Sequence, residues 1–355
     1  MSFEQHPELS VIVPVLNESA ALLPFLTGLA RQEQIRFEVI LSDGGSRDGS
    51  VELAESFKEQ LPFPLSVLAG PRGRAGQLNR GAALARAPQL LFLHCDCELP
   101  DPLALRNALD ALAREAARGD RVAGRFRLEF DFPGPIPLPY RYYGAKATLD
   151  RPGCTHGDQG FLMSAALFRE CGPFDETLPI MEDTFLAERL RRTGRWLLFP
   201  ATLKTSPRRF LSEGLLPRQT LNAMISNLAA IGRLDLIEEL KGCYRSQHAA
   251  TRLELAPFYH TIRLWIDRLP QEERREFWLA TGNFVRQSAW QIPFFCDVLL
   301  ASALPGTGGS FLRLHDRFLA RLLDCRLADR LAARLVRIWF WAVCRNLARQ
   351  TQNGR

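Results

Sequence analysis

The stretch LSVIVPVLNESAALLPFLTGLARQEQIRFEVILSDGGSRDGS, residues 9–50, decides the fold class. Its two apolar runs, LSVIVP at 9–14 and FEVILS at 37–42, are continuous rather than alternating, which is typical of strands buried on both faces. Between them, residues 19–32 carry the apolar spacing of a helix. A strand, a helix and a second strand in this order predict a parallel sheet.

The same alternation continues to about residue 117. LSVLAG at 65–70 and QLLFLH at 89–94 are the next predicted strands, with helices at 50–59, 75–85 and 101–117. Further on we predict strands at 122–130, 161–163 and 196–199, a helix at 183–193 and a lid-like loop, FPGPIPLP, at 132–139. After about residue 207 we expect helices only. The predicted fold is α/β, with a mostly parallel sheet flanked by helices and an α-helical C-terminal region, divided into domains 1–235 and 236–355.

Composition bounds the class of protein. Hydrophobic residues make up 46% of the chain and charged residues 24%, which excludes a disordered or collagen-like chain. The net charge of +6 suits phosphate-bearing ligands or an anionic membrane surface, and we expect no nucleic-acid partner. The N-terminal MSFEQHPELS has no apolar signal segment, and no apolar run approaches the roughly 20 residues of a membrane span. We therefore expect a cytoplasmic location.

Polar loops follow the first two predicted strands. VPVLNES at 13–19 and SDGGSRDGS at 42–50 place short polar side chains where parallel sheets bind ligands. Glycines in the second loop permit close backbone approach, and Asp43 and Asp48 offer acceptors for a base or ribose. The structural alternative is a plain turn with Ser50 capping the next helix.

A basic loop follows the third predicted strand. GPRGRAGQLNRG at 70–81 supplies Arg72 and Arg74 just before a helix, a natural setting for phosphate. A solvated basic loop is the alternative.

The fourth predicted strand leads into LHCDCELP at 93–100. Asp96 is the better candidate for holding Mg²⁺ or Mn²⁺, since a hard cation prefers oxygen ligands and shares them with substrate phosphates. His94 is an optional second ligand, or else a hydrogen-bonded residue at the end of a strand.

Carboxylates recur in the second half of the sheet domain. THGDQGFLMS at 155–164 and LPIMEDTFLAERLRRTG at 178–194 carry Asp158, Glu182 and Asp183. Asp183 is placed to act as a general base, and the structural alternative is an N-cap.

Taken together, these segments resemble the inverting family-2 glycosyltransferases with the GT-A fold over roughly residues 8–244, and most closely the bacterial arsenosugar-biosynthesis subgroup. The resemblance rests on VPVLNE, SDGGSRDGS, GRAGQLNRG, LHCDCELP, GDQGF and MEDTFLAERLRRTG, with TSPRRF at 205–210 matching the subgroup. It implies transfer of a sugar from a nucleotide-diphosphate donor to an acceptor, with inversion at the anomeric carbon and help from Mg²⁺ or Mn²⁺. The acceptor stays open, a lipid-linked acceptor included.

The resemblance also implies roles for single positions. Asp183 corresponds to the base and Asp96 to the last acid of the metal-binding D-x-D motif, in which His94 replaces the first acid. The resemblance further divides the predicted binding residues into two groups. The donor group is Glu18, Asp43, Ser46, Arg74, Gln77 and Asp96, and the acceptor or second-half group is Asp158, Gln159 and Glu182.

Two other functions use similar features. A sugar nucleotidyltransferase needs a Gly-rich basic loop directly after the first strand, where this chain has VLNES. A non-catalytic nucleotide-sugar-binding protein would keep the donor loops and lose the base, which Glu182 and Asp183 argue against.

The C-terminal segment predicts a basic amphipathic helix from Arg326 to Arg349. Its arginines gather on one side, and an apolar face gathers opposite. The arginines are Arg326, Arg330, Arg334, Arg337 and Arg345, and the apolar face is Leu335, Val336, Trp339, Ala342 and Val343. Either this helix docks peripherally on the anionic inner face of a membrane, or its apolar face packs on Phe311, Leu314 and Phe318.

Overall fold

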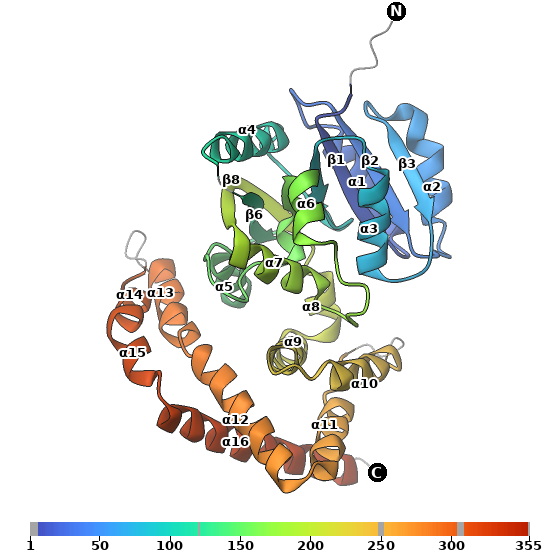
Figure 1. Ribbon diagram of the computed structural model, residues 1–355. Coiled ribbons are helices and arrows are strands. Elements are labelled where there is room, and N and C mark those ends of the chain that lie inside the picture. Colours follow the sequence, from blue (N-terminus) through green and yellow to red (C-terminus); the bar gives the residue numbers. More distant parts are fainter. Residues whose placement is uncertain (1–5, 120, 248–251, 304–308, 354–355) are drawn as a thin grey trace, which may run out of the picture. The chain divides into compact units, whose positions relative to one another are not determined.

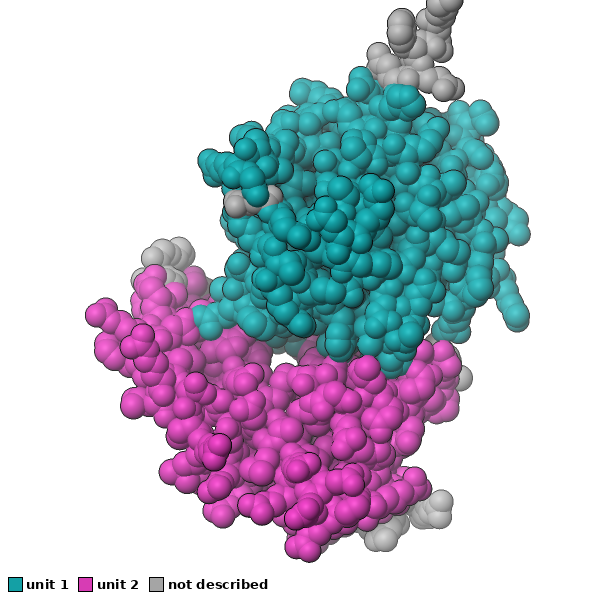
Figure 2. Space-filling model, viewed as in Figure 1, with its two compact units in different colours: residues 1–207 teal, residues 208–355 magenta. Residues whose placement is uncertain are grey.

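Residues 6–119, 121–247, 252–303 and 309–353 are described by a computed structural model. The chain divides into two compact units, residues 1–207 and residues 208–355, which Figure 2 colours separately. Unit 1 contains every strand of the described chain, and unit 2 is helical throughout its described residues. The predicted boundary at 235/236 therefore differs from the boundary between the compact units. The unit boundary instead coincides with the predicted change to helices after about residue 207, since β8 ends at Thr205 and α8 begins at Arg208.

Unit 1 is built on one eight-stranded sheet in the order β3-β2-β1-β4-β7-β6-β8-β5 (Figure 1). Its first four strands are parallel, with Leu9 of β1 opposite both Phe37 of β2 and Gln89 of β4. Beyond β4 the sheet is mixed, because β7 runs antiparallel to both of its neighbours. The strands are β1 (Leu9–Val15), β2 (Phe37–Asp43), β3 (Leu65–Ala69), β4 (Gln89–Phe92), β5 (Cys97–Glu98), β6 (Val122–Phe130), β7 (Phe161–Ser164) and β8 (Arg195–Thr205).

Continuous apolar strands place a core on each face of this sheet. Val11 and Val13 lie in one cluster with side chains from α1, α2 and α4, whereas Ile12 lies in the other with side chains from α3, α6 and α7. Successive strand residues point to opposite faces, so only an apolar residue at every position fills both clusters. The helices of unit 1 are α1 (Ser19–Leu29), α2 (Ser50–Phe57), η1 (Lys58–Gln60), α3 (Arg74–Leu84), α4 (Ala104–Ala116), α5 (Leu138–Ala147), η2 (Gly157–Gln159), α6 (Ala165–Cys171) and α7 (Glu182–Thr193).

The predicted α/β fold with a helical C-terminal region is confirmed, and the first four predicted strands each fall within one residue or two of an observed strand. The predicted lid-like loop at 132–139 is shorter than expected, because α5 already begins at Leu138, one residue after Pro137. Proline suits the start of a helix, where its missing N–H has no partner to lose.

Unit 2 consists of helices that pack largely on their neighbours in sequence. Two described helices also pack on more distant ones: α12 contacts α9, and α16 returns to pack against α12 and α11. Among the described helices, none combines the length and apolar character that a membrane-spanning segment needs. The elements are α8 (Arg208–Glu213), α9 (Leu215–Ala230), α10 (Leu234–Arg245), α11 (Ala256–Arg268), α12 (Gln271–Gln287), α13 (Gln291–Ala303), α14 (Ser310–Leu314), η3 (His315–Leu319), α15 (Ala320–Leu323) and α16 (Arg326–Asn353).

The predicted C-terminal helix is present as α16. It differs from the prediction in which apolar side chains it buries and in what they pack against. Leu335 and Trp339 are 68% and 50% exposed, and only Val336 and Val343 of the predicted apolar face are partly covered. The side chains that α16 buries are Ala333 and Phe340. The proposed packing on Phe311, Leu314 and Phe318 is wrong, since all three are exposed as well.

We predict that Gly124→Ala destabilises unit 1 by about 1–3 kcal/mol, the usual cost of overpacking a core. A Cβ atom at Gly124 would lie 1.9 Å from Cζ of the buried Phe199 ring. Gly134→Ala is the matched control, because its Cβ would meet nothing within 4 Å. Urea unfolding followed by tryptophan fluorescence measures both, and equal midpoints for the two variants would contradict the packing described.

Candidate active site

The loops that follow β1 and β2 are locked together by hydrogen bonds. The amide of Asn17 donates to Oγ of Ser46 at 2.8 Å, and the amide of Arg47 donates to Oδ1 of Asn17 at 2.9 Å. The amide of Glu18 likewise donates to Oγ of Ser50 at 2.9 Å. Glu18 and Ser46 of the predicted donor group are thus brought together at the carboxyl ends of two neighbouring strands.

Asp43 shapes the second loop. Its buried carboxylate accepts the amide N–H groups of Gly45 at 2.8 Å and of Ser46 at 3.0 Å. Gly45 has φ of +90°, which lets both amides turn back toward this carboxylate. The turn of the structural alternative is therefore present, but Ser50 does not cap the next helix, because α2 begins at Ser50 and its N-cap is Gly49.

Gln77 lies beneath the two loops rather than on their surface. Its Nε2 donates to the carbonyl oxygens of Val15 at 2.8 Å and of Ser42 at 2.7 Å, and the side chain is 3% exposed. A Cβ atom on Gly44 would meet this amide at 3.0 Å. Gln77 therefore satisfies two strand-end carbonyls and fixes the backbone that carries the loops.

Arg74 links the first turn of α3 to the start of α7. Its Nε donates to Oε1 of Glu182, and its Nη2 lies 3.7 Å from Oδ1 of Asp183. Glu182 is buried, whereas the Arg74 side chain is 39% exposed. One guanidinium therefore holds two consecutive carboxylates from a segment more than a hundred residues away in the chain.

Asp183 is not the N-cap that the sequence alternative proposed. The helix begins at Glu182, and its N-cap is Met181, which has φ of 68°. The Asp183 carboxylate instead accepts the amide of Gly157 at 2.8 Å on Oδ2 and the amide of Thr184 at 2.7 Å on Oδ1. It thus joins α7 to the loop before β7.

His94 pairs with Asp158, since its Nδ1 lies 3.0 Å from Oδ1 of that residue. The His94 side chain is largely buried and the Asp158 side chain is half exposed. Asp96, two residues further on, is partly buried, and its backbone carbonyl accepts the amide of Ser206 at 3.1 Å. The predicted metal-ligating positions thus lie at the carboxyl end of β4, beside the loop that carries Asp158.

The charges at this site shift one another's pKa values. Burial opposes ionisation of Asp183, but the Arg74 guanidinium and the Gly157 amide outweigh it and lower the pKa of the carboxyl group. Burial likewise disfavours the charge on Arg74, yet Asp183 and Glu182 raise the pKa of its guanidinium. Burial lowers the pKa of His94, and the hydrogen bond to Asp158 more than reverses this. Asp183 is therefore ionised throughout the neutral range.

The side chain of Gln159 is buried and forms hydrogen bonds with backbone groups of the protein. Its Nε2 donates to the carbonyl oxygens of Ala147 at 2.8 Å and of Phe126 at 3.3 Å, while its Oε1 accepts the amide of His156 at 3.1 Å. Its amide group thereby anchors the short helix η2, which carries Asp158.

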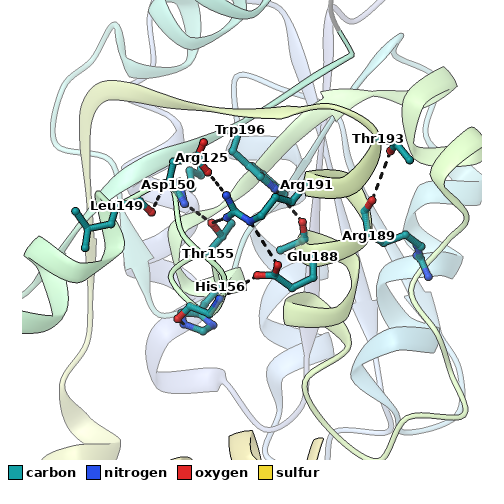
Figure 3. Close-up of polar contacts among 12 residues, drawn as sticks. Arg125, Leu149, Asp150, Thr155, His156, Glu188, Arg189, Arg191, Thr193 and Trp196 are labelled. Carbon is teal, nitrogen blue, oxygen red and sulfur yellow. Dashed lines mark hydrogen bonds and ion pairs between the residues drawn. The ribbon is translucent and has the colours of Figure 1, made fainter. Parts of the chain in front are cut away.

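A polar network that the sequence did not reveal holds the preceding loop (Figure 3). The hydroxyl of Thr155 accepts hydrogen bonds from both Arg125 and Arg191, the latter at 2.9 Å. Arg191 also pairs with Asp150, and Glu188 accepts the amide of Gly153 at 3.0 Å. Arg125 comes from β6 and Arg191 from α7, so side chains from a strand and from a helix both hold the loop that carries Thr155.

His156 and Thr184 are further site residues that the prediction missed. His156 Nε2 lies 3.1 Å from the carbonyl oxygen of Gly153, so this nitrogen carries the proton and Nδ1, at 3.2 Å, accepts the hydroxyl of Thr184. Burial lowers the pKa of His156, which favours this neutral form. The motif THGDQG contained the signal, but only the fold shows that His156 faces α7.

Five of the predicted residues meet around one small pocket. Arg74, His94 and Asp183 line it directly, Glu182 pairs with Arg74, and Asp158 pairs with His94. Gly157 and the apolar side chains Leu78, Phe92, Phe161 and Phe174 complete the lining. Of the remaining predicted residues, Glu18, Asp43 and Ser46 lie in the two interlocked loops and Gln77 beneath them, whereas Asp96 follows β4 and Gln159 ends η2.

Residues 10–170 match the model of the family "Glycosyl transferase family 2". Over these residues, unit 1 is thus similar to the family 2 glycosyltransferases. The match includes the interlocked loops, Arg74, His94, Asp96 and Asp158, and it ends before α7.

Curated relatives match part of the chain. A PGL/p-HBAD biosynthesis glycosyltransferase of Mycobacterium tuberculosis is 38% identical over 112 residues, which cover 31% of this chain and 41% of the relative. The dolichol-phosphate mannosyltransferase of Mycosarcoma maydis is 30% identical over 137 residues, covering 36% and 46%. The chain thus spans less than half of the length of these relatives. The arsenosugar-biosynthesis subgroup stays a prediction of the sequence.

Solved structures resemble the chain over most of its length at low identity. A mannosyltransferase from Pyrobaculum calidifontis, in complex with GDP-Man and Mn²⁺, is 17% identical with a TM-score of 0.49, covering 95% of this chain and 88% of that one. Residues 1–349 of S. aureus TarS, in complex with UDP, are 18% identical with a TM-score of 0.48, covering 93% and 91%.

We predict that Gln77→Met destabilises unit 1 by about 1–3 kcal/mol and also weakens donor binding. The substitution leaves the buried carbonyls of Val15 and Ser42 without their donor and loosens both loops. Gln60→Met, at an exposed helix end, is the control and should stay within about 0.5 kcal/mol of wild type. Urea unfolding and calorimetric titration with nucleotide sugars measure the two effects. Unchanged stability would show that the two carbonyls do not depend on this amide.

Proposed function

We propose that this protein transfers a sugar from a nucleotide-diphosphate donor to a nucleophilic acceptor, with Asp183 as the general base and with inversion at the anomeric carbon. The observation that carries the proposal is the Asp183 carboxylate. It lines the pocket, it is ionised, and it is held by the Gly157 amide and by Arg74. An ionised carboxylate held in a fixed orientation at a pocket is what deprotonation of an acceptor requires.

The proposed reaction is a single displacement. The acceptor oxygen forms a bond to the anomeric carbon while the bond from that carbon to the diphosphate oxygen breaks. The acceptor's proton passes to the carboxylate of Asp183, and the electron pair of the broken bond leaves with the nucleoside diphosphate. Because attack and departure occur on opposite sides of the carbon, one step inverts its configuration.

The charges around the pocket support a divalent cation. Asp96, Asp158, Glu182 and Asp183 bring four carboxylates to this end of the sheet, against Arg74 and His94. A diphosphate, itself anionic, would be repelled unless a cation accompanied it.

The described residues fit a cation that shares its ligands with the donor. They contain no cluster of three or more His, Cys, Asp or Glu side chains able to hold a metal alone. Mg²⁺ and Mn²⁺ need no such cage, since one or two carboxylates, waters and substrate phosphates suffice. Asp96 would hold the ion, with His94 as a second ligand through Nε2, because Nδ1 already faces Asp158. When bound, the cation would neutralise charge on the departing diphosphate.

We assign roles to the other predicted site residues from their positions. We assign Glu18, Asp43 and Ser46 to the nucleoside side of the donor, since the interlocked loops present them at the strand ends. Arg74 would contact the diphosphate at the start of α3, where the helix N-terminus also favours anions. Gln77 acts as a positioning residue beneath these loops and Gln159 as one that anchors η2, while Asp158 and Glu182 fix His94 and Arg74. The acceptor and the arsenosugar subgroup remain unassigned, with a lipid-linked acceptor among the candidates.

Asp183→Asn should lower turnover by about 10²-fold or more with donor affinity retained, because the amide cannot accept the acceptor's proton. The measurement is donor consumption with a screened acceptor, alongside calorimetric donor binding. Asp101→Asn is the control, since that exposed aspartate only accepts the amide of Leu103 at 2.9 Å. Turnover within a few-fold of wild type would return Asp183 to a structural role and favour a different base. A wild-type chain that binds donors and never turns over would indicate a non-catalytic binding protein.

Asp96→Ala should abolish the dependence of donor binding on Mg²⁺ or Mn²⁺ while leaving the fold intact, because the cation loses its protein oxygen ligand. Glu98→Ala, two residues away with an exposed side chain that pairs with Arg31, is the matched control. Donor affinity is titrated calorimetrically with and without the cation, and thermal midpoints report folding. If the Asp96 variant keeps both the wild-type affinity and the wild-type metal requirement, the assignment is wrong.

A further inference from the structure

Exposed apolar side chains are concentrated in unit 2. Among the described residues, every large hydrophobic side chain that is exposed lies there, apart from Leu84. Proteins rarely leave large apolar patches exposed to water, so this concentration of exposed apolar side chains indicates a surface that binds a partner. The richest element is α16, where five such side chains recur. They are Leu327, Leu331, Leu335, Ile338 and Trp339.

The helix α16 has three distinct faces. The five exposed apolar residues follow each other at spacings of three, four or one, which places them on one side of the helix. The packed side is a different one, since Ala333 and Phe340 are buried where α16 meets α12 and α11. Trp339 lies at the border of the two sides, 6.1 Å from the ring of Tyr259. The apolar stripe is therefore additional to the face that stabilises unit 2.

A third face, along one edge of the apolar stripe, is basic. Arg326, Arg330, Arg334 and Arg337 are exposed and recur at spacings of four and three. No ion pair within the described residues neutralises these arginines. The one acid of α16, Asp329, turns toward α12, where it pairs with Arg286 at 2.6 Å. The solvent side of α16 thus combines exposed leucines with uncompensated positive charge.

We infer that this face of α16 binds the surface of an anionic lipid bilayer, with the helix lying in the plane of the interface. An apolar stripe bordered by arginines and a tryptophan matches the headgroup and acyl boundary, where leucines enter the hydrocarbon and arginines contact lipid phosphates. The inference rests on unit 2 alone and does not depend on the proposed chemistry of unit 1.

The charges favour a bilayer over a second copy of this chain. A two-fold interface would place the same patch on both partners, so the basic edges of two α16 helices would lie in one contact. The exposed sides of α16 offer no acid to pair with them. An anionic lipid surface supplies that complementary charge.

Cosedimentation with vesicles tests the inference on the full chain. Wild type should bind equimolar phosphatidylglycerol and phosphatidylcholine vesicles and should not bind phosphatidylcholine alone. The variant Leu331→Gln, Leu335→Gln, Ile338→Gln keeps the charge and removes the apolar stripe, and it should lose binding by about tenfold or more. The variant Arg330→Gln, Arg334→Gln, Arg337→Gln should lose binding to a similar degree, about tenfold or more.

Matched controls separate this surface from net charge and from misfolding. The variant Arg114→Gln, Arg141→Gln, Arg192→Gln removes the same charge from exposed positions in unit 1 and should bind like wild type. Thermal midpoints should agree for all four proteins, since every substitution is at an exposed position. Three outcomes would overturn the inference. They are absent wild-type binding, binding indifferent to both α16 variants, and a wild-type dimer that only the apolar variant dissociates while vesicle binding persists.

Discussion

The ion pairs between Arg74 and the consecutive carboxylates of Glu182 and Asp183 are the constraint on which the site depends. Arg74 opens α3, which connects β3 to β4 in the parallel half of the sheet, whereas the carboxylates open α7, which precedes β8 in the mixed half. This contact ties the start of α3 to the carboxylate that we propose as the base. The same guanidinium lowers the pKa of Asp183, so one residue affects both the position and the ionisation of this carboxylate.

A second layer of contacts supports that constraint. Asp183 accepts the Gly157 amide, and the loop before Gly157 is held by Arg125 and Arg191 through Thr155. At the Arg74 end of the contact, Gln77 of the same helix donates hydrogen bonds that tie α3 to the ends of β1 and β2. These contacts are mostly buried, where lost partners are costly, so they limit how far the base and the donor loops can shift. Fixed partners thus hold the carboxylates around the pocket, and under the proposed function a divalent cation would accompany the anionic donor.

Sequence reasoning predicted the strands well because burial on both faces favours apolar residues at nearly every position, as in Leu9–Val15, where Ser10 is the polar exception. It also found the polar loops at the strand ends. It could not separate Gln77 and Gln159, which satisfy buried carbonyls, from side chains that contact a ligand, since both kinds of residue lie in polar motifs. Periodicity showed that α16 is amphipathic but could not show which apolar residues its neighbours cover. Long-range partners, such as those of Arg74 and Thr155, have no local signal at all.

The most direct test of this account is a crystal structure of the chain with a nucleotide-sugar donor and Mn²⁺. The account predicts the diphosphate between Arg74 and a cation at Asp96, with the face of the anomeric carbon opposite the diphosphate turned toward the carboxylate of Asp183. It would be contradicted by a donor that binds elsewhere on unit 1, or by one whose diphosphate rather than sugar faces Asp183, because that carboxylate could then take no proton from an attacking acceptor.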